Sequence, residues 1–529
     1  MNNVLSIYFY HDAAIAVKIG NIYRSFEVER YNRQRYSDLN IENYKEVYDT
    51  IFHIIKEEYG VVTFDTCLYN KGMKSHDKIF GHQMEYVRTL WSIKEFVSCS
   101  HHNAHASGTF YLSDFEESLV FSYDGGGWYN NSIVDFFNIY YYNRNIGEKK
   151  LLHRIGKDLG TPYGVTAIPV SEIHKEPILP PPKFLSFAGK LMGLSAYGKA
   201  NYYNAFYDFY NKYKKSSTPF LWNKIKELNI GHTIDINSLE GKVSWDFAAS
   251  SQKAFEDTSI NLTENSIKQY NLPICLTGGC ALNVLLNERL RQLYHLPIFV
   301  SPFPNDCGIA IGMIMDMFPP NDIPNITYGN FPLLDKENLS YYISKYAAKT
   351  FSYNRLCKLL QEGKIIGIAK GNSECGPRAL GNRSIICDPS FADMKDTLNA
   401  KVKFREWYRP FAPFVQLEDA NTYFNFDWKS PYMSFAPEVR EEYRNVYPSI
   451  THVDGTARLQ TVNTFEHEMF YDLLAQYKNT YGKGVLLNTS FNIKGKPILT
   501  RIEDAIQVLE NTEIDAVCIE DYIFEKNSI

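Results

Sequence analysis

Residues 4–20 read VLSIYFYHDAAIAVKIG. The first seven are rich in β-branched and aromatic side chains, a composition typical of a buried strand. The polar pair His11–Asp12 then interrupts the run, and a second apolar run follows and ends at Gly20. The pattern predicts a β-hairpin that carries an acid in its turn. The polar break and the lack of preceding basic residues also argue against a secretory signal peptide.

The same plan returns between Ser118 and Tyr142. Here SLVFSYD runs into the three glycines Gly125–Gly127, and the strand-like run SIVDFFNIYYYN follows the turn. Each copy therefore has an apolar strand, an acid, a turn and another strand. Two such copies separated by helical sequence are expected of a duplicated actin-like (ASKHA) ATPase fold, which is an α/β fold. Two loosely similar hairpins also arise by coincidence, and on this feature alone that alternative stays open.

The whole chain has the composition of a globular protein with more than one domain. It has 529 residues, of which 45% are hydrophobic and 22% charged, and its net charge is −5. This charge gives no basic footprint for duplex nucleic acid. The nine cysteines form no CxxC pair, which indicates a reducing compartment. No apolar run reaches membrane-spanning length, so we expect a cytoplasmic protein without membrane contact.

Two stretches of unusual composition indicate how the chain is divided. EPILPPPKF, residues 176–184, is rich in proline and predicts an exposed loop. FPPNDIPNITYGNFPLL, residues 318–334, resembles a linker, and a new strand–loop–helix series begins after it with GKIIGIAKG. We therefore expect a domain boundary near residues 335–345, with a first domain over 1–335 and a second over 336–529.

The densest cluster of chemically active residues is SHHNAHASG. His101 and His105 are four residues apart, so on a helix they share one face and can bind one metal ion, while His102 points elsewhere. Asp124, at the end of a predicted strand, and Asp306, in PFPNDCGIAIG, can complete the site. Two histidines and two aspartates suit iron(II), with magnesium, manganese and zinc as alternatives. Two polar neighbours on a helix, without a metal, are the other interpretation.

Two further motifs of the first half suit a nucleotide. In TGGCALN, Gly278 and Gly279 follow a predicted strand, and the helix after them offers its N-terminus to an anion. In KLMGLSAYGK, Lys190 can meet a phosphate. Taken singly, a double glycine is usually a tight turn and a lysine is usually solvated, so both of these alternatives stay open.

Four loops of the second half carry groups suited to phosphate. The loops are GPRALGNRS, KVKFREWYRPFAPF, HVDGTARLQTV and LLNTSFNIKGKPI. Arginine holds phosphate through paired hydrogen bonds, which lysine cannot do. Together the loops predict a converging anion pocket, and a set of structural salt bridges is the alternative. The candidates are Arg378, Arg383, Lys401, Lys403, Arg405, Arg409, Arg458, Ser490 and Asn492.

Together these motifs resemble the O-carbamoyltransferases of the nodulation-factor and antibiotic-tailoring type. The first half matches that family's order and approximate spacing in HDAAIAV, EVERYNRQR, HHNAHA, YDGGG, KLMGLSAYG, TGGCALN and NDCGIAIG. The second half matches its most specific motifs, GPRALGNRS, KFRE with RPFAP, DGTARLQ and NTSFN. The resemblance spans nearly the whole chain. It implies an actin-like first domain, similar to the ATPase that modifies tRNA with threonylcarbamoyl, and a C-terminal YrdC-like α/β domain.

The resemblance also implies roles for single residues. The metal ligands would be His101, His105, Asp124 and Asp306, and the nucleotide contacts would include Lys190, Gly278, Gly279 and Asn283. Carbamoyl phosphate and ATP would be bound by Arg378, Lys403, Arg409, Arg458, Ser490 and Asn492, with Arg378 and Lys403 catalytic. His11 and Asp12 match the motif near the acceptor, where His11 would be the general base. The chain departs from the family's pattern at Ser195, Asn305, Cys375 and Trp407.

The function that follows is ATP-dependent O-carbamoyl transfer. Carbamoyl phosphate would be converted with ATP and Mg²⁺ to carbamoyl adenylate. The carbamoyl group would then pass to a hydroxyl of a sugar, an antibiotic-like metabolite or a nucleoside or nucleotide. The alternatives are a threonylcarbamoyl-type tRNA modification enzyme and a non-catalytic actin-like nucleotide-binding scaffold. The appended second domain disfavours the first, and the full set of metal ligands and arginines disfavours the second. A homodimer is considered as the assembly.

Overall fold

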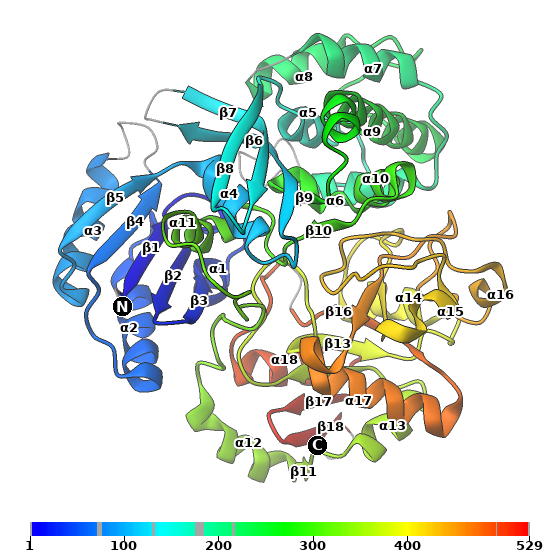
Figure 1. The fold of residues 1–529 in the computed structure, drawn as a ribbon. Helices are drawn as coiled ribbons and strands as arrows, with labels where there is room; N and C mark the ends of the chain where they lie inside the picture. The colour runs from blue at the N-terminus through cyan, green and yellow to red at the C-terminus, as the bar shows by residue number, and fades with distance from the viewer. Residues whose placement is uncertain are drawn as a thin grey trace. The chain divides into compact units, whose positions relative to one another are not determined.

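The computed structural model describes residues 3–70, 77–129, 133–174, 185–213, 217–492 and 495–526. The exposed loop predicted over 176–184 therefore lies outside the described residues. The chain forms two compact units, drawn in Figure 1. The first comprises residues 1–191, 199–282 and 290–330, and the second comprises 192–198, 283–289 and 331–529. The single boundary expected near residues 335–345 stays a prediction.

The first sheet is built around the predicted N-terminal hairpin. β1 (Val4–Tyr8) pairs antiparallel with β2 (Ala14–Ile19), which pairs antiparallel with β3 (Ile22–Glu27). On its other side, β1 runs parallel to β4 (Thr66–Asn70), and β4 runs parallel to β5 (Glu95–Cys99). The strand order is therefore β3-β2-β1-β4-β5.

The second sheet repeats this plan. The long hairpin of β6 (Glu117–Tyr129) and β7 (Ile133–Asn143) continues antiparallel into β8 (Glu148–Ile155). β6 also runs parallel to β9 (Ile274–Thr277), and β9 runs parallel to β10 (Ile298–Val300). The order β8-β7-β6-β9-β10 matches that of the first sheet strand by strand. Coincidence does not produce two such sheets, so the N-terminal unit has the predicted duplicated actin-like ATPase fold.

Two helices form a layer between the sheets. α11 (Ile309–Met317) packs on β1, β2 and β4, and α4 (His101–Phe110) packs on β6, β7 and β9. The two helices also pack against each other. Nearly every residue of both is buried, because each helix faces a sheet on one side and its partner helix on the other.

Small residues allow α4 and α11 to cross closely. A Cβ atom on Gly312 would lie 2.1 Å from the carbonyl oxygen of Ala104, and one on Gly108 would lie 3.0 Å from Gly312 Cα. No side chain fits at the first position without a backbone shift. The crossing therefore fixes the N-terminal ends of both helices relative to each other.

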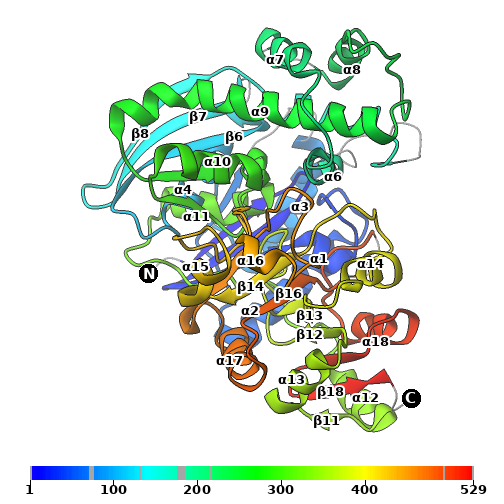
Figure 2. The ribbon, with the colours of Figure 1, turned by 90° about the vertical axis from the view of Figure 1, so that its right-hand side faces the viewer.

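The remaining helices of the first unit surround this centre. Glu172 stabilises the start of the longest one, α9 (Gly241–Tyr270), which Figure 2 shows lengthwise. Its Oε1 accepts hydrogen bonds from the Gly241 amide (2.8 Å) and the Ser244 hydroxyl (2.7 Å), so one of the helix's free N-terminal amides is satisfied. The others are α1 (Val28–Asn32), α2 (Tyr44–Tyr59), α3 (Asp77–Trp91), α5 (Gly160–Val165), α7 (Tyr203–Lys212) and α8 (Thr218–Lys226). Two more helices, α6 (Leu185–Ser195) and α10 (Val284–Tyr294), belong partly to the first unit and partly to the second.

The second unit contains one mixed sheet of eight strands. Their order is β11 (Lys349–Thr350), β18 (Tyr522–Glu525), β17 (Ala516–Ile519), β12 (Ile366–Ala369), β13 (Arg383–Cys387), β16 (Val485–Ser490), β14 (Ala412–Gln416) and β15 (Gln460–Val462). Its helices are α12 (Leu339–Tyr346), α13 (Tyr353–Gln361), α14 (Met394–Thr397), α15 (Ala420–Tyr423), α16 (Glu441–Arg444), α17 (Thr464–Tyr481) and α18 (Ile502–Asn511). Leu356 and Leu360 of α13 join Phe470 and Leu474 of α17 in one buried core with the sheet. The YrdC-like assignment of this α/β unit stays a prediction.

Two segments from earlier in the chain belong to this second unit. In segment 192–198, the Tyr197 ring lies edge-on to Trp407, with 4.9 Å between the ring centroids. In segment 283–289, the Asn287 side-chain amide donates to the Ser434 carbonyl oxygen at 3.0 Å. The second unit is therefore assembled from three separate parts of the sequence.

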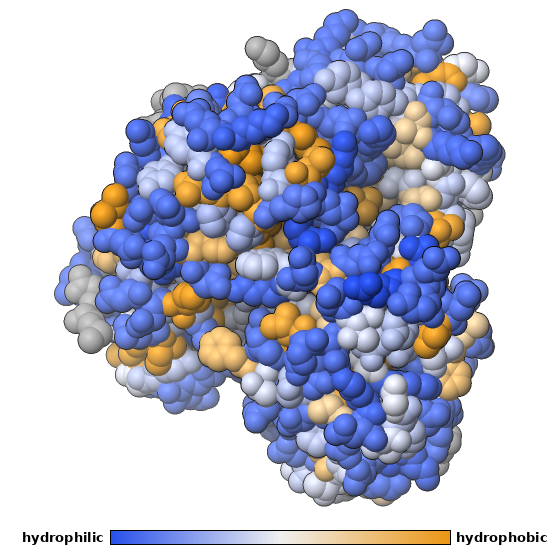
Figure 3. All heavy atoms as spheres, turned by 45° about the vertical axis from the view of Figure 1, so that its right-hand side comes forward, coloured by the Kyte–Doolittle hydropathy of each residue, from blue (hydrophilic) through white to orange (hydrophobic). Residues whose placement is uncertain are grey.

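Polar side chains cover most of the face seen in Figure 3, where apolar side chains form small separate groups. Within the described parts of the chain, no helix combines the length and the apolar character that crossing a membrane requires.

The helix crossing can be tested with two glycine variants. Gly312→Ala places a methyl group against the Ala104 carbonyl and should cost about 1–3 kcal/mol through overpacking. Gly81→Ala, at an exposed position of α3 with no atom within 4 Å of the new Cβ, should stabilise the chain by about 0.5–1 kcal/mol. Thermal unfolding followed by circular dichroism gives both midpoints. Equal midpoints for the two variants would contradict the close crossing.

Candidate active site

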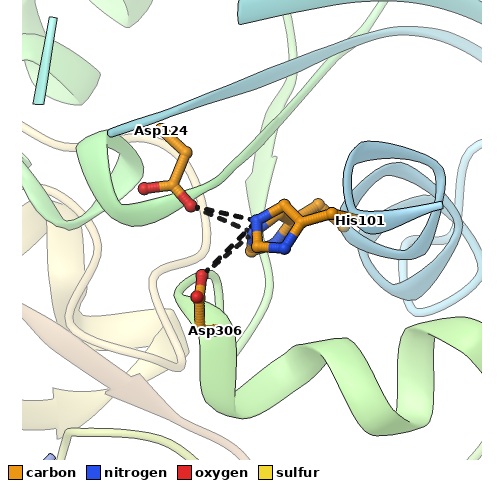
Figure 4. A group of neighbouring side chains, drawn as sticks. His101, Asp124 and Asp306 are labelled. Carbon is orange, nitrogen blue, oxygen red and sulfur yellow. Dashed lines mark hydrogen bonds and ion pairs between the residues drawn. The ribbon is translucent and has the colours of Figure 1, made fainter. Parts of the chain in front are cut away.

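Four side chains converge where α4 and α11 begin. His101 and His105 lie on one face of α4, Asp124 lies in β6 before the glycine run, and Asp306 begins the 3₁₀ turn that leads into α11. From Asp124 Oδ2, the imidazole Nε2 atoms of His101 and His105 are 3.4 and 3.3 Å away. From Asp306 Oδ1, they are 3.6 and 3.4 Å away. Figure 4 shows the two carboxylates turned toward the imidazole of His101, Asp124 from the upper left and Asp306 from the lower left.

The donor set fits one divalent cation. Four ligand atoms about 2.1 Å from a tetrahedral ion lie about 3.4 Å apart, and the nitrogen–oxygen separations here are 3.3, 3.4, 3.4 and 3.6 Å. All four ligand atoms lie within 4.8 Å of one another. The structure thus brings together the four residues predicted as ligands. Their role as ligands stays a prediction, and so does the identity of the metal.

Glycines allow these side chains to meet. A Cβ atom on Gly127 would lie 2.2 Å from the His101 ring, so only glycine leaves room for the imidazole. Asp124 Oδ1 accepts hydrogen bonds from the amides of Gly125 (2.7 Å) and Gly279 (3.3 Å). These bonds leave Oδ2 to face the histidines. The TGG turn predicted for nucleotide contact therefore also positions a predicted metal ligand.

The electrostatics of the site favour ionised carboxylates. Burial opposes ionisation of Asp124, but the hydrogen bonds and charges of His101 and His105 outweigh it and hold the Asp124 pKa well below its usual range. The pKa of Asp306 is also lowered, because the charges of His101 and His11 overcome burial and the repulsion from Asp124. Burial alone would lower the pKa of His105, but the two aspartates raise it to about 9. A bound cation would take the place of this histidine charge.

His102 lies apart from this set, as the sequence predicts. Its Nδ1 lies 2.7 Å from the Ser122 hydroxyl and its Nε2 lies 2.9 Å from the Asp135 carbonyl oxygen. Burial and the neighbouring histidines lower its pKa to about 3. His102 is therefore neutral and connects α4 to β6 and β7.

The structure places His11 and Asp12 in the turn between β1 and β2, beside the histidine–aspartate set. His11 Nδ1 lies 3.1 Å from Asp12 Oδ2, and its Nε2 lies 3.5 Å from Asp306 Oδ2. The His11 side chain is 43% exposed, so it can reach an incoming molecule. Burial of the ring opposes protonation, but Asp306 and Asp12 raise its pKa to about 10. A protonated imidazole cannot act as a base, so base chemistry at His11 requires a positive charge that offsets these carboxylates.

The four predicted nucleotide contacts differ in their surroundings. Lys190, in α6, donates from Nζ to the Ile173 carbonyl oxygen at 3.0 Å. Gly278 has a φ of +85°, and a Cβ there would lie 2.2 Å from the Tyr123 carbonyl oxygen. Asn283 belongs to the second unit, and its side-chain oxygen accepts from the Leu286 amide at 3.0 Å at the start of α10. Their roles toward a nucleotide stay predictions.

In the second unit, Lys403 lies against two other predicted residues. The Lys403 side chain is buried, and its Nζ donates to the Ser490 carbonyl oxygen (2.5 Å), to the Ser490 hydroxyl (3.2 Å) and to Asn492 Oδ1. The Ser490 hydroxyl also donates to Asn492 Oδ1 at 2.8 Å. These three residues form one polar cluster beside the end of β16. A phosphate bound by Lys403 would replace some of these acceptors.

Three predicted arginines form a second cluster. Burial lowers the pKa of Arg458 well below its usual value, and the charges of Arg378 and Arg409 lower it further. Arg458 Nε is buried and has no hydrogen-bond partner among the described residues. A carboxylate oxygen of Glu406 lies 3.5 Å from Arg409 Nη1. Guanidinium groups close enough to affect one another's charge suit a polyvalent anion. The role of these three arginines as an anion site stays a prediction.

Sequence reasoning missed the residues that hold the Arg378 loop in place. Glu374 is buried, and its Oε1 accepts from the amides of Leu380 (2.6 Å), Gly381 (3.2 Å) and Arg383 (3.3 Å). The Gln460 side-chain amide donates to the Leu380 carbonyl oxygen at 3.1 Å. An acid just before a glycine-rich turn is a signal for such a role, because turn amides need acceptors.

Arg383 does not serve the anion cluster. It is fully buried, and its guanidinium donates to the carbonyl oxygens of Lys370 (2.8 Å) and Gly371 (2.7 Å). Arg405 is also held by its own loop, through Asn399 Oδ1 at 2.7 Å. Both arginines therefore stabilise backbone turns.

Comparison with known proteins gives matches over both halves of the chain. The family model "Carbamoyltransferase N-terminus" matches residues 78–315, and "Carbamoyltransferase C-terminus" matches residues 357–526. Nodulation protein NolO of Bradyrhizobium diazoefficiens is 31% identical over 81% of this chain and 79% of its own length. Nodulation protein NolNO of Sinorhizobium fredii is 29% identical over 98% of this chain and 80% of its own length. The 3'-hydroxymethylcephem-O-carbamoyltransferase of Streptomyces clavuligerus is 31% identical over 64% of each chain.

Removal of one histidine tests the cation site. We expect the chain to take up one divalent ion, and we expect His105→Ala to weaken its binding by more than about 100-fold, because loss of a ligand exceeds the effect of losing a supporting hydrogen bond. The control is His153→Ala, which removes an exposed histidine of β8. Metal content after reconstitution with Fe²⁺ or Co²⁺, together with calorimetric titration, measures the effect. Equal binding by both variants would contradict the site.

Proposed function

The chain belongs to the O-carbamoyltransferase family, and we propose that it transfers a carbamoyl group from carbamoyl phosphate, activated by ATP, to a hydroxyl of a small molecule. The observation that carries this proposal is the presence of two sites of opposite charge. The arginine cluster of the second unit suits polyphosphate, and the histidine–aspartate set of the first unit suits a cation that binds phosphate.

The first half-reaction belongs to the second unit. Water hydrolyses carbamoyl phosphate to carbamate and inorganic phosphate, and a carbamate oxygen then attacks the α-phosphorus of ATP. Pyrophosphate leaves, and carbamoyl adenylate remains. Arg378, Arg409 and Arg458 would hold the phosphate groups and offset the charge on pyrophosphate. Lys403, with Ser490 and Asn492, would bind the carbamoyl end, because it offers both donors and acceptors.

The second half-reaction belongs to the first unit. His11 would take the proton of the acceptor hydroxyl while that oxygen attacks the carbamoyl carbon and AMP leaves. Asp12 would accept from Nδ1 of His11 and so orient the imidazole, and Nε2, which lies 3.5 Å from Asp306 Oδ2, would be the nitrogen that takes the proton. A divalent cation would supply Lewis-acid stabilisation of the leaving phosphate. We propose iron(II), held by His101, His105, Asp124 and Asp306.

The acceptor is proposed to be small and hydroxylated. The name of the Streptomyces clavuligerus relative specifies a hydroxymethyl group as the carbamoylated position.

The proposed use of two separate sites also requires that carbamoyl adenylate be kept from water between its formation and its use, because a mixed anhydride hydrolyses readily.

Two variants separate the half-reactions. Arg378→Ala should abolish adenylate formation, because phosphate binding loses one of three guanidinium groups. His105→Ala should leave adenylate formation intact and block transfer. The measurement is isotope exchange between pyrophosphate and ATP in the presence of carbamoyl phosphate, and mass spectrometry then identifies carbamoyl adenylate. Arg440→Ala is the control, because this arginine of the second unit pairs with Asn421 on the surface.

The proposal fails if the two variants behave alike in the exchange assay. It also fails if folded, metal-loaded wild-type protein forms neither carbamoyl adenylate nor pyrophosphate with a panel of hydroxylated acceptors present.

A further inference from the structure

The two oxygens of Asp306 face different partners. Oδ1 lies 3.6 and 3.4 Å from the Nε2 atoms of His101 and His105, and thus belongs to the cation site shown in Figure 4. Oδ2 accepts a hydrogen bond of 2.5 Å from the Tyr8 hydroxyl, and the same oxygen lies 3.5 Å from His11 Nε2. One carboxylate therefore connects the cation site to the proposed base, and Tyr8 holds the oxygen that faces the base.

Tyr8 is itself rigidly placed. It is the last residue of β1, where it pairs with Ala14 of β2 at the base of the hairpin turn that carries His11. Its side chain is 3% exposed, and its ring packs edge-on against Tyr10 and tilted against His101, with centroid distances of 5.5 and 6.0 Å. The hydroxyl of a buried ring in a sheet has almost no freedom to move. It can therefore fix a partner that comes from a distant part of the chain.

We propose that Tyr8 is a positioning residue that restricts Asp306 to one oxygen at the cation site and reserves the other for His11. The inference rests on the proposed function, since it assumes that a cation binds at Asp306. A carboxylate without such a bond can rotate and bind a cation through both oxygens. Rotation of Asp306 would break a buried, charge-assisted hydrogen bond and would also withdraw Oδ2 from His11.

Hydrogen bonds of this kind are a regular part of metal sites. The partners of metal-binding side chains set the orientation of those side chains, and their loss usually costs about 10- to 100-fold in metal affinity or activity. Neither the histidine spacing nor the acids at the strand ends identifies Tyr8, because its role depends on a contact between residues 8 and 306.

The experiment compares Tyr8→Phe with Tyr142→Phe in the full chain. Tyr8→Phe keeps the ring packing and removes only the hydroxyl. Tyr142→Phe also removes a buried tyrosine hydroxyl, which contacts the Ser107 hydroxyl on α4. Neither Tyr142 nor Ser107 belongs to the predicted cation ligands. Each protein is titrated with Co²⁺, and its visible absorption is recorded, because the intensity of cobalt absorption falls as the coordination number rises. We expect Tyr8→Phe to bind Co²⁺ about 10- to 100-fold more weakly with a less intense spectrum, and Tyr142→Phe to match the wild type.

A second measurement uses the Asp306→Ala background, which removes the oxygen that accepts from Tyr8. If Tyr8 acts through Asp306, removing its hydroxyl there should change neither affinity nor spectrum further. This comparison keeps the inference testable if thermal unfolding shows that Tyr8→Phe alone is poorly folded.

The outcomes separate this inference from the proposed function. Co²⁺ binding and absorption of Tyr8→Phe equal to those of the wild type would overturn the role of Tyr8 and leave the cation site intact. A wild-type chain that binds no Co²⁺ would overturn the cation site and the inference together. Equal losses of Co²⁺ affinity in Tyr8→Phe and Tyr142→Phe would show that any buried hydroxyl near α4 affects cation binding. This result would also overturn the inference.

Discussion

The close contact between α4 and α11 is the constraint on which the first unit depends. Gly312 brings the backbone of α11 against the Ala104 carbonyl of α4, and each helix packs on a different sheet. Because both helices begin at the same end of this contact, His101 and His105 meet Asp306. The hairpins of the two sheets then add Asp124 from one side and His11 from the other. The site is thus a consequence of how the duplicated sheets are joined.

Patterns local in sequence predicted much of this arrangement. Alternating apolar runs with an acid in the turn revealed both hairpins, and the spacing of His101 and His105 indicated one helix face. The same reasoning could not find Tyr8 or Glu374, because a side chain that acts by a hydrogen bond to a distant group leaves no periodic signal. It also could not distinguish Arg458, which faces other arginines, from Arg383, which serves backbone carbonyls. The charge of an arginine is visible in sequence, but its partner is not.

The two sites are incomplete in opposite senses. In the first unit, the charges of the neighbouring histidines help to keep the carboxylates of Asp124 and Asp306 ionised. In the second unit, burial lowers the pKa of Arg458, and the charges of Arg378 and Arg409 lower it further. The buried Arg458 guanidinium costs folding free energy that a bound anion would return. The Glu374 carboxylate accepts hydrogen bonds from the Leu380 and Gly381 amides and so holds the loop that carries Arg378 in place.

The second unit is discontinuous in the sequence. Because residues 192–198 and 283–289 belong to it, the chain passes between the units at residues 191/192, 198/199, 282/283, 289/290 and 330/331. A coding segment that starts at residue 331 would lack the parts that supply Tyr197 beside Trp407 and Asn287 beside Ser434. An exchange of residues 331–529 alone would therefore leave two segments of the second unit behind. Recombination that swaps C-terminal halves between relatives would carry a mismatch in these two inserts.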